Sequence, residues 1–150
     1  MLYFALGAVV VVLDQLTKLL VQARIPMGQS VAVFHPVLYF THVQNPGAAF
    51  GIFPAGSFLF VMITFIVLGA LGWFVYTTRP KDPLLLLGIT FSASGALGNV
   101  IDRLRIGKVV DFIDIRVWPI FNVADIAIVG GVLLLLWYIV RQPKTQGERW

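Results

Sequence analysis

The chain contains no cysteine, and this absence excludes several kinds of chemistry at once. Disulfide bonds, thiolate metal sites and cysteine nucleophiles all require a side chain that the sequence does not have. Histidine is nearly as scarce, since His35 and His42 are the only two in 150 residues. Without an HExxH pattern, two isolated histidines are a poor basis for a zinc site. We therefore expect neither a metal nor an organic cofactor.

Charged residues are also few, at 12% of the chain, whereas 59% of the residues are hydrophobic. Soluble domains have about 25% charged and about 45–50% apolar residues. A single domain of this length cannot bury such an excess in its own core, so a lipid bilayer is the natural environment. The net charge of +4 forms no basic run and no alternation with aromatic residues. Nucleic acid is therefore not an expected partner.

Four apolar stretches are each long enough to cross roughly 30 Å of hydrocarbon at about 1.5 Å per helical residue. They lie at residues 2–23, 58–76, 84–101 and 120–140. We predict an all-α integral membrane protein with one domain over residues 1–150 and a polar tail at residues 141–150. The first stretch lacks a basic leading segment and a small-residue cleavage site, so we expect a retained span and not a cleaved signal peptide.

The connection between the first two spans is long for a compact protein, and long connections are usually functional. Within it, residues 30–35 and 37–43 alternate in polarity around Pro36, which predicts a short β-ribbon. Residues 48–53 could form a short helix or an interfacial segment. A further strand-like run at residues 108–118 follows the third span.

Polar residues in and around the apolar stretches converge on one membrane face. A charge inside the bilayer is costly, so it usually faces protein or water and marks a functional site. Asp14 and Lys18 are spaced i,i+4 in the second half of span one and can pair on one helix face. Because the spans alternate in direction, the same face receives the polar residues that end span three, begin span four and lie in the long loops, namely Asn99, Arg103, Asn122, Asp125, Asn45 and Asp111.

Asp111 and Asp125 flank the start of span four and could meet at the membrane surface. Two close carboxylates cannot both ionise easily, so one keeps a proton. The ionised carboxylate can take a proton from water, while the protonated one can hydrogen-bond a scissile carbonyl and then protonate the leaving amine. Such a pair would titrate as a unit. The alternative for Asp125 is a helix cap.

Two nearby aspartates have simpler interpretations. Asp102 and Arg103 could be an interfacial charge pair at the end of span three. Asp114 is three residues from Asp111, so we expect its side chain on the opposite face of the strand and in solvent.

Other functions use the same polar groups differently. Ser92 or Ser94 with Lys18 could imitate a serine–lysine hydrolase, but small residues at 91–99 more simply allow close helix packing. A proton- or cation-coupled transporter could use Asp14, Lys18 and Asp125, although the sequence shows no inverted repeat. A non-catalytic assembly subunit, in which polar groups only join helices, is the remaining alternative.

Four blocks of the sequence resemble the signature blocks of lipoprotein signal peptidases, also called signal peptidase II. They occur in the family's order and none is missing: DQLTK at residues 14–18, NPGAAFGIF at 45–53, GALGNVIDRLRIGKVVDFIDI at 95–115 and FNVADIAI at 121–128. The resemblance implies a four-helix aspartic endopeptidase with a small extramembrane sheet that cradles the substrate. It implies a catalytic pair, Asp111 and Asp125, and supporting residues Asp14, Lys18, Asn45, Gly47, Asn99, Arg103 and Asn122.

The resemblance also implies a substrate and a location. Family members remove the signal peptide of prolipoproteins just before a cysteine that carries diacylglycerol, and cyclic peptides such as globomycin inhibit them. The expected partners are lipid-modified prolipoproteins and membrane lipid, and the expected state is a monomer. Lysine and arginine are equally numerous on the two sides of the membrane, so charge alone leaves the orientation open. The family has both termini in the cytoplasm of the bacterial cell and its active site toward the outer face of the inner membrane.

Overall fold

Long apolar segments form four helices in the computed structural model, which describes residues 1–47 and 56–142. The elements are α1 (Leu2–Arg24), β1 (Ser30–Phe34), β2 (Leu38–Asn45), α2 (Gly56–Thr78), α3 (Pro83–Ile106), β3 (Val109–Asp114) and α4 (Val123–Arg141). All four helices have the length and hydropathy of membrane spans, which confirms the predicted fold class. The segment at residues 48–53 and the polar tail beyond residue 142 lie outside the described residues.

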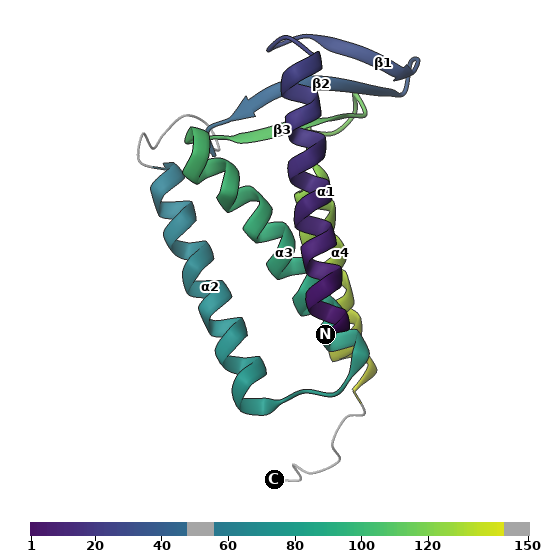
Figure 1. Ribbon diagram of the computed structural model, residues 1–150. Helices are drawn as coiled ribbons and strands as arrows, with labels where there is room; N and C mark the ends of the chain where they lie inside the picture. Colours follow the sequence, from purple (N-terminus) through teal and green to yellow (C-terminus); the bar gives the residue numbers. More distant parts are fainter. Residues whose placement is uncertain (48–55, 143–150) are drawn as a thin grey trace, which may run out of the picture.

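Helix α3 is the centre of the bundle. It packs closely against α1 and α4, while α2 stands apart and contacts α3 but neither of the other two described helices (Figure 1). Glycine makes the close approach possible, because a Cβ on Gly98 would lie 2.6 Å from the Oδ2 atom of Asp14 and a Cβ on Gly95 would clash with the carbonyl of Ala124. The packing role expected for the small residues at 91–99 is thus confirmed.

Helix α3 is longer than the sequence predicted. The predicted span ends at Ile101, where charged residues begin, but the helix continues for another turn to Ile106 and is capped by Gly107, whose φ of 72° is left-handed. The extra turn is compatible with charge because Asp102 is buried against protein rather than lipid. This turn extends the polar face of α3 as far as the sheet, where Asp102 accepts a hydrogen bond from the N–H of Val110 in β3.

The three strands form one antiparallel sheet in the order β1-β2-β3. In Figure 1 the sheet covers one end of the bundle, and the start of α1 and the end of α4 lie at the opposite end. Strand β2 pairs with β3 so that Val43 is opposite Asp111 and Asn45 is opposite Val109. Strand β3 is shorter than the predicted run at 108–118, because the backbone leaves the extended conformation at Arg116, where φ is 66°.

Candidate active site

Asp111 in β3 and Asp125 in the first turn of α4 are joined by a single residue, Asn122. Asn122 is the N-cap of α4, and its side-chain oxygen accepts a hydrogen bond of 2.9 Å from the backbone N–H of Asp125. The carboxylate of Asp125 returns a capping contact by accepting from the backbone N–H of Asn122 at 3.1 Å. Asp125 therefore completes a capping box with Asn122, in line with the simpler interpretation, and this box brings Asp125 next to Asp111.

Only one of the two possible orientations of the Asn122 amide fits its neighbours, the one with its nitrogen toward Asp111. Because its oxygen is occupied by the N–H of Asp125, its nitrogen is directed to Asp111, where Nδ2 donates to Oδ1 at 2.7 Å. The same nitrogen lies 3.3 Å from the carbonyl oxygen of Val110. The capping geometry therefore supplies one donor to the Asp111 carboxylate.

A lysine fixes the amide of Asn99 in the same way. Lys18 has only donors, and its Nζ donates to the oxygen of Asn99 at 3.0 Å. The nitrogen of Asn99 then faces Asp125 and donates to its Oδ1 at 2.8 Å. Lys18 thus acts on Asp125 through Asn99.

Asn45 and Gly47 bring the long first connection to Asp111. The N–H of Gly47 donates to the Asn45 oxygen at 2.9 Å, which leaves Asn45 Nδ2 to donate to Asp111 Oδ2 at 3.1 Å. Gly47 has a φ of 77°, and a Cβ there would lie 3.1 Å from the ring of Phe60. Glycine is therefore required at this turn.

The environment of Asp111 favours retention of a proton. Its side chain is only 4% exposed. Burial raises its pKa from 3.8 to about 6, and the nearby charge of Asp125 adds to the rise, while hydrogen bonds from Asn45 and Asn122 and the charge of Lys18 oppose it. A carboxyl with this pKa can gain or lose a proton near neutral pH, which suits acid–base catalysis.

Next to the Asp111–Asp125 pair, hereafter the dyad, Lys18 lies between two buried carboxylates. Its Nζ is 2.9 Å from Asp14 Oδ2 and 2.9 Å from Asp102 Oδ2, and all three side chains are at most 2% exposed. The Asp14–Lys18 pair predicted from the i,i+4 spacing is present. The interpretation of Asp102 as an interfacial partner of Arg103 is wrong, because Asp102 pairs with Lys18. The sequence carried a signal for this, since Asp102 follows Asn99 by three residues on one helix face.

Arg103 lies beside the site without contacting either carboxylate of the dyad among the described contacts. Its Nη1 donates to the Asn99 carbonyl at 3.4 Å, and its guanidinium lies over the ring of Phe60, 5.1 Å from the centroid. Its Nη2 would be 3.7 Å from a Cβ on Gly47. Arg103 therefore connects α3 with α2 and with the turn at Gly47.

Asp114 is not in solvent, contrary to our expectation, because it is only 6% exposed. It accepts hydrogen bonds from the Thr41 hydroxyl at 2.8 Å and from the backbone N–H of Arg116 at 2.9 Å. Burial alone would raise its pKa, but these two bonds and the charge of Arg116 outweigh burial and lower the pKa. Asp114 thus binds a separate set of groups from Asp111, and its partners Thr41 and Arg116 stabilise the sheet region and not the Asp111–Asp125 pair.

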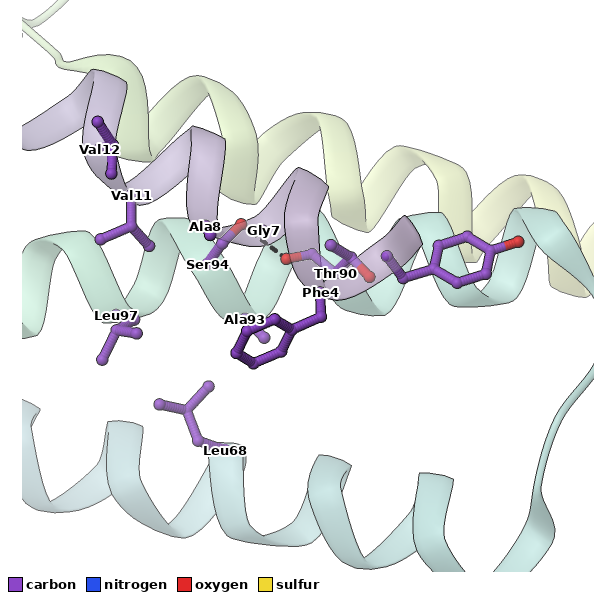
Figure 2. Close-up of a pocket in the computed structure, with 11 residues that line it drawn as sticks. Phe4, Gly7, Ala8, Val11, Val12, Leu68, Thr90, Ala93, Ser94 and Leu97 are labelled. Carbon is purple, nitrogen blue, oxygen red and sulfur yellow. Dashed lines mark hydrogen bonds between the residues drawn. The ribbon is translucent and has the colours of Figure 1, made fainter. Parts of the chain in front are cut away.

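The serine–lysine arrangement does not form. Ser94 lines an apolar groove of about 450 Å³ between α1, α2 and α3, and its hydroxyl donates to the carbonyl of Thr90 (Figure 2). Ser92 packs against Gly131 of α4. Lys18 contacts Asp14, Asp102 and Asn99 instead of either serine. As for metals, no group of three or more His, Asp or Glu side chains suited to hold an ion occurs within residues 1–47 and 56–142.

Comparison with known proteins identifies the family. A family model described as Signal peptidase (SPase) II matches residues 6–141. The chain belongs to the signal peptidase II family. A lipoprotein signal peptidase from Pelotomaculum thermopropionicum is 46% identical over 149 residues, which cover 99% of this chain and 98% of that protein. Another from Halothermothrix orenii is 43% identical over 136 residues, 91% of this chain and 93% of that protein.

A solved structure supports the same conclusion. A bacterial membrane enzyme determined by the in meso method at 2.3 Å resolution has a TM-score of 0.88 and 34% identity, covering 99% of this chain and 93% of that one. Membership of signal peptidase II makes the chain a multi-pass membrane peptidase, and it confirms the resemblance that the four sequence blocks indicated.

Proposed function

We propose that this chain is an aspartic endopeptidase that removes the signal peptide of prolipoproteins just before a diacylglyceryl-modified cysteine. The observation that carries the proposal is the Asp111–Asn122–Asp125 arrangement, in which one asparagine holds both carboxylates at the end of the bundle next to the sheet. The names of the relatives support the substrate, because both are lipoprotein signal peptidases.

The chemistry follows from one proton shared by two carboxylates. The ionised carboxylate takes a proton from a water molecule while the oxygen of that water bonds to the scissile carbonyl carbon. The protonated carboxyl donates a hydrogen bond to the carbonyl oxygen. When the tetrahedral intermediate collapses, the carbon–nitrogen bond breaks and the amine nitrogen receives a proton from the pair. Asn45, Asn99 and Asn122 hold the two carboxylates in place throughout, because each has its oxygen occupied and its nitrogen turned to the dyad.

An apolar groove beside Asp125 suits a substrate that is anchored in lipid. The groove has a volume of about 580 Å³, and Asp125 lies among its lining residues, which include Trp118, Phe121, Ile126, Val129 and Leu133. Several of these side chains face outward from α4, and Val129 and Leu133 are 58% and 60% exposed. The apolar part of a lipid-modified peptide can therefore approach laterally and place its peptide bond at Asp125, without passing through the bundle.

The same proposal includes the location. We place the protein in the bacterial inner membrane as a monomer, with both termini in the cytoplasm and the dyad toward the outer face. The arrangement of the elements is compatible with this orientation, because the sheet, whose strand β3 carries Asp111, lies at the end of the bundle opposite the start of α1 and the end of α4 (Figure 1).

The decisive experiment uses purified protein in detergent with two versions of one prolipoprotein, diacylglyceryl-modified and unmodified. We expect cleavage of the modified form only, and mass spectrometry should place the new N-terminus at the modified cysteine. Asp111→Asn protein serves as the matched control for contaminating peptidases. Proton or cation flux in liposomes without cleavage would support the transporter instead, and neither activity would support the assembly subunit.

A further inference from the structure

The backbone just before Asp125 is held by a carboxylate from another helix. Asp14 of α1 accepts a hydrogen bond of 2.9 Å from the N–H of Ala124, the residue that precedes Asp125. Asp14 is fully buried and Ala124 is fully buried, so the bond is shielded from competing water. The position of the first turn of α4 therefore depends on where Asp14 lies.

The backbone just before Asp111 is held in the same manner. Asp102 of α3 accepts a hydrogen bond of 3.1 Å from the N–H of Val110, the residue that precedes Asp111. Both residues are buried, at 2% and 0% exposure. A second pair of carboxylates thus holds the two backbone segments from which the dyad projects.

Two side chains join Asp14 to Asp102. Lys18 forms an ion pair with each, and the side-chain nitrogen of Gln15 donates to Asp14 Oδ2 at 3.1 Å and to Asp102 Oδ1 at 3.2 Å. One lysine cannot neutralise two carboxylates, so the pair keeps an excess negative charge in a buried place. The Gln15 amide offsets the mutual repulsion by offering a hydrogen to both carboxylates.

Arg105 fixes the orientation of the Gln15 amide. Its oxygen accepts from Nη1 of Arg105 at 3.3 Å, and since arginine is only a donor, the nitrogen must face the carboxylates. The nitrogen also lies 3.1 Å from the carbonyl of Gly98. Gln15 is half-buried on α1 and touches neither Asp111 nor Asp125 among the described contacts.

We propose that Gln15 is a positioning residue that sets the separation of Asp111 and Asp125, because its amide joins the two carboxylates that hold the backbone before each of them. The inference rests on the proposed function. Without the amide, Asp14 and Asp102 repel each other more strongly and move apart, which displaces the backbone before each dyad residue and weakens the bond from each carboxylate to its N–H. The dyad then widens, and the coupling between its two ionisations weakens.

The first test needs no substrate. Hydrogen–deuterium exchange should show slow exchange at the Val110 and Ala124 amides of the wild-type protein in detergent. Both should exchange faster in Gln15→Met, while the Phe112 amide, which donates to the carbonyl of Phe121, should not change. Gln22→Met is the matched control, because Gln22 is also on α1 but, within residues 1–47 and 56–142, its amide donates only to the backbone carbonyl of Lys18.

The second test measures cleavage of a lipidated prolipoprotein across pH. Gln15→Met should lower kcat by about tenfold with KM within about twofold of wild type, because it misplaces the dyad and not the substrate. Its pH–kcat profile should be narrower, because weaker coupling brings the two apparent pKa values together. Gln22→Met should match the wild-type protein in kcat and in profile.

The outcomes separate the alternatives. A lower kcat with an unchanged profile and a lower melting temperature would reduce Gln15 to a structural residue and overturn the inference, as would unchanged exchange at Val110 and Ala124. If Gln15→Met does not fold, Gln15→Asn decides, since it keeps an amide but is too short to join both carboxylates, and wild-type behaviour in that variant would also overturn the inference. If the wild-type protein does not cleave but the exchange pattern holds, the proposed function is refuted. The hold of Asp14 and Asp102 on the backbone N–H groups of Ala124 and Val110 would still stand.

Discussion

Asn122 donates to Asp111 with the same side chain whose oxygen caps the helix that carries Asp125. One residue therefore serves two purposes that can be separated by mutation. We expect Asn122→Asp to keep the cap, because aspartate is as good an N-cap as asparagine. It places a third buried carboxylate against Asp111 and the carbonyl of Val110, so we expect cleavage to fall by about 100-fold or more and the melting temperature to fall as well. Asn122→Ala should lose the cap as well, at a cost of about 1 kcal/mol in stability.

The dyad itself should behave as one unit. Asp111→Asn and Asp125→Asn are nearly isosteric, and each should abolish cleavage at matched expression. The double variant should be no worse than either single one, because the pair fails when either member is lost. Asp114→Asn should retain substantial activity, since Asp114 binds Thr41 and Arg116 and not the dyad. Loss of activity in Asp114→Asn with Asp111→Asn still active would reverse our assignment of the two aspartates.

The raised pKa of Asp111 makes a prediction about stability. Its pKa is about 6 in the folded protein against 3.8 ordinarily, so between about pH 4 and 6 the folded state binds more protons than the unfolded state. The free energy of unfolding contributed by Asp111 is therefore greatest below pH 4 and declines as the pH rises toward 6. Asp111→Asn should remove this pH dependence, so the free energy of unfolding of the variant relative to wild type should be higher at pH 7 than at pH 4 by on the order of 1–3 kcal/mol.

Thermal unfolding in detergent at pH 4 and pH 7 tests this prediction. The difference in melting temperature between Asp111→Asn and wild type should be clearly larger at pH 7. An equal difference at both values would mean that burial does not raise the pKa of Asp111.

Arg103 and Arg105 are two residues apart on α3 but point to different neighbours. Arg103 lies over Phe60 and near Gly47, and Arg105 donates to Gln15. We expect Arg103→Ala and Arg103→Lys to lose several-fold activity, about 1 kcal/mol in activation free energy, because lysine keeps the charge but not the planar fork. Arg105→Ala should lose less. Wild-type activity in Arg103→Ala would leave Arg103 as an interfacial anchor only.

Inhibitors distinguish the mechanism class. Chelators and reagents directed at serine or cysteine should not slow cleavage, because the proposed reaction uses two carboxylates and water. A cyclic peptide of the globomycin kind, which mimics substrate near the dyad, should inhibit it. Activity lost on dialysis against EDTA and restored by zinc would contradict the proposal.

The spans and most of the site were predictable because hydropathy and helical spacing are local properties of the sequence. Asp14 with Lys18 and Asn122 with Asp125 each lie one turn apart on a helix, and the structure places both pairs as expected. Asp102 was misassigned because its partner comes from another helix, and the adjacent Arg103 offered a simpler explanation.

Asp114 was placed in solvent because the alternation of a strand says which face a side chain is on but not what covers that face. Thr41 of β2 binds it, and Thr41 lies at the register shift between Phe40 and Val43, where the alternation of the strand is interrupted. Gln15 gave no signal of this role, because its contacts beyond the neighbouring Asp14 are all with residues of α3, namely Gly98, Asp102 and Arg105.

The Asp14–Lys18 pair has a consequence for insertion into the membrane. The two charges are on one helix, spaced i,i+4, so α1 carries its own counter-ion while it enters the bilayer ahead of the rest of the chain. Asp102 has no such partner on α3 among its described contacts and becomes paired only when α3 meets α1. When the bundle assembles, Lys18 is therefore shared between Asp14 and Asp102, and the helix made first provides the cation that pairs with the carboxylate of the later one.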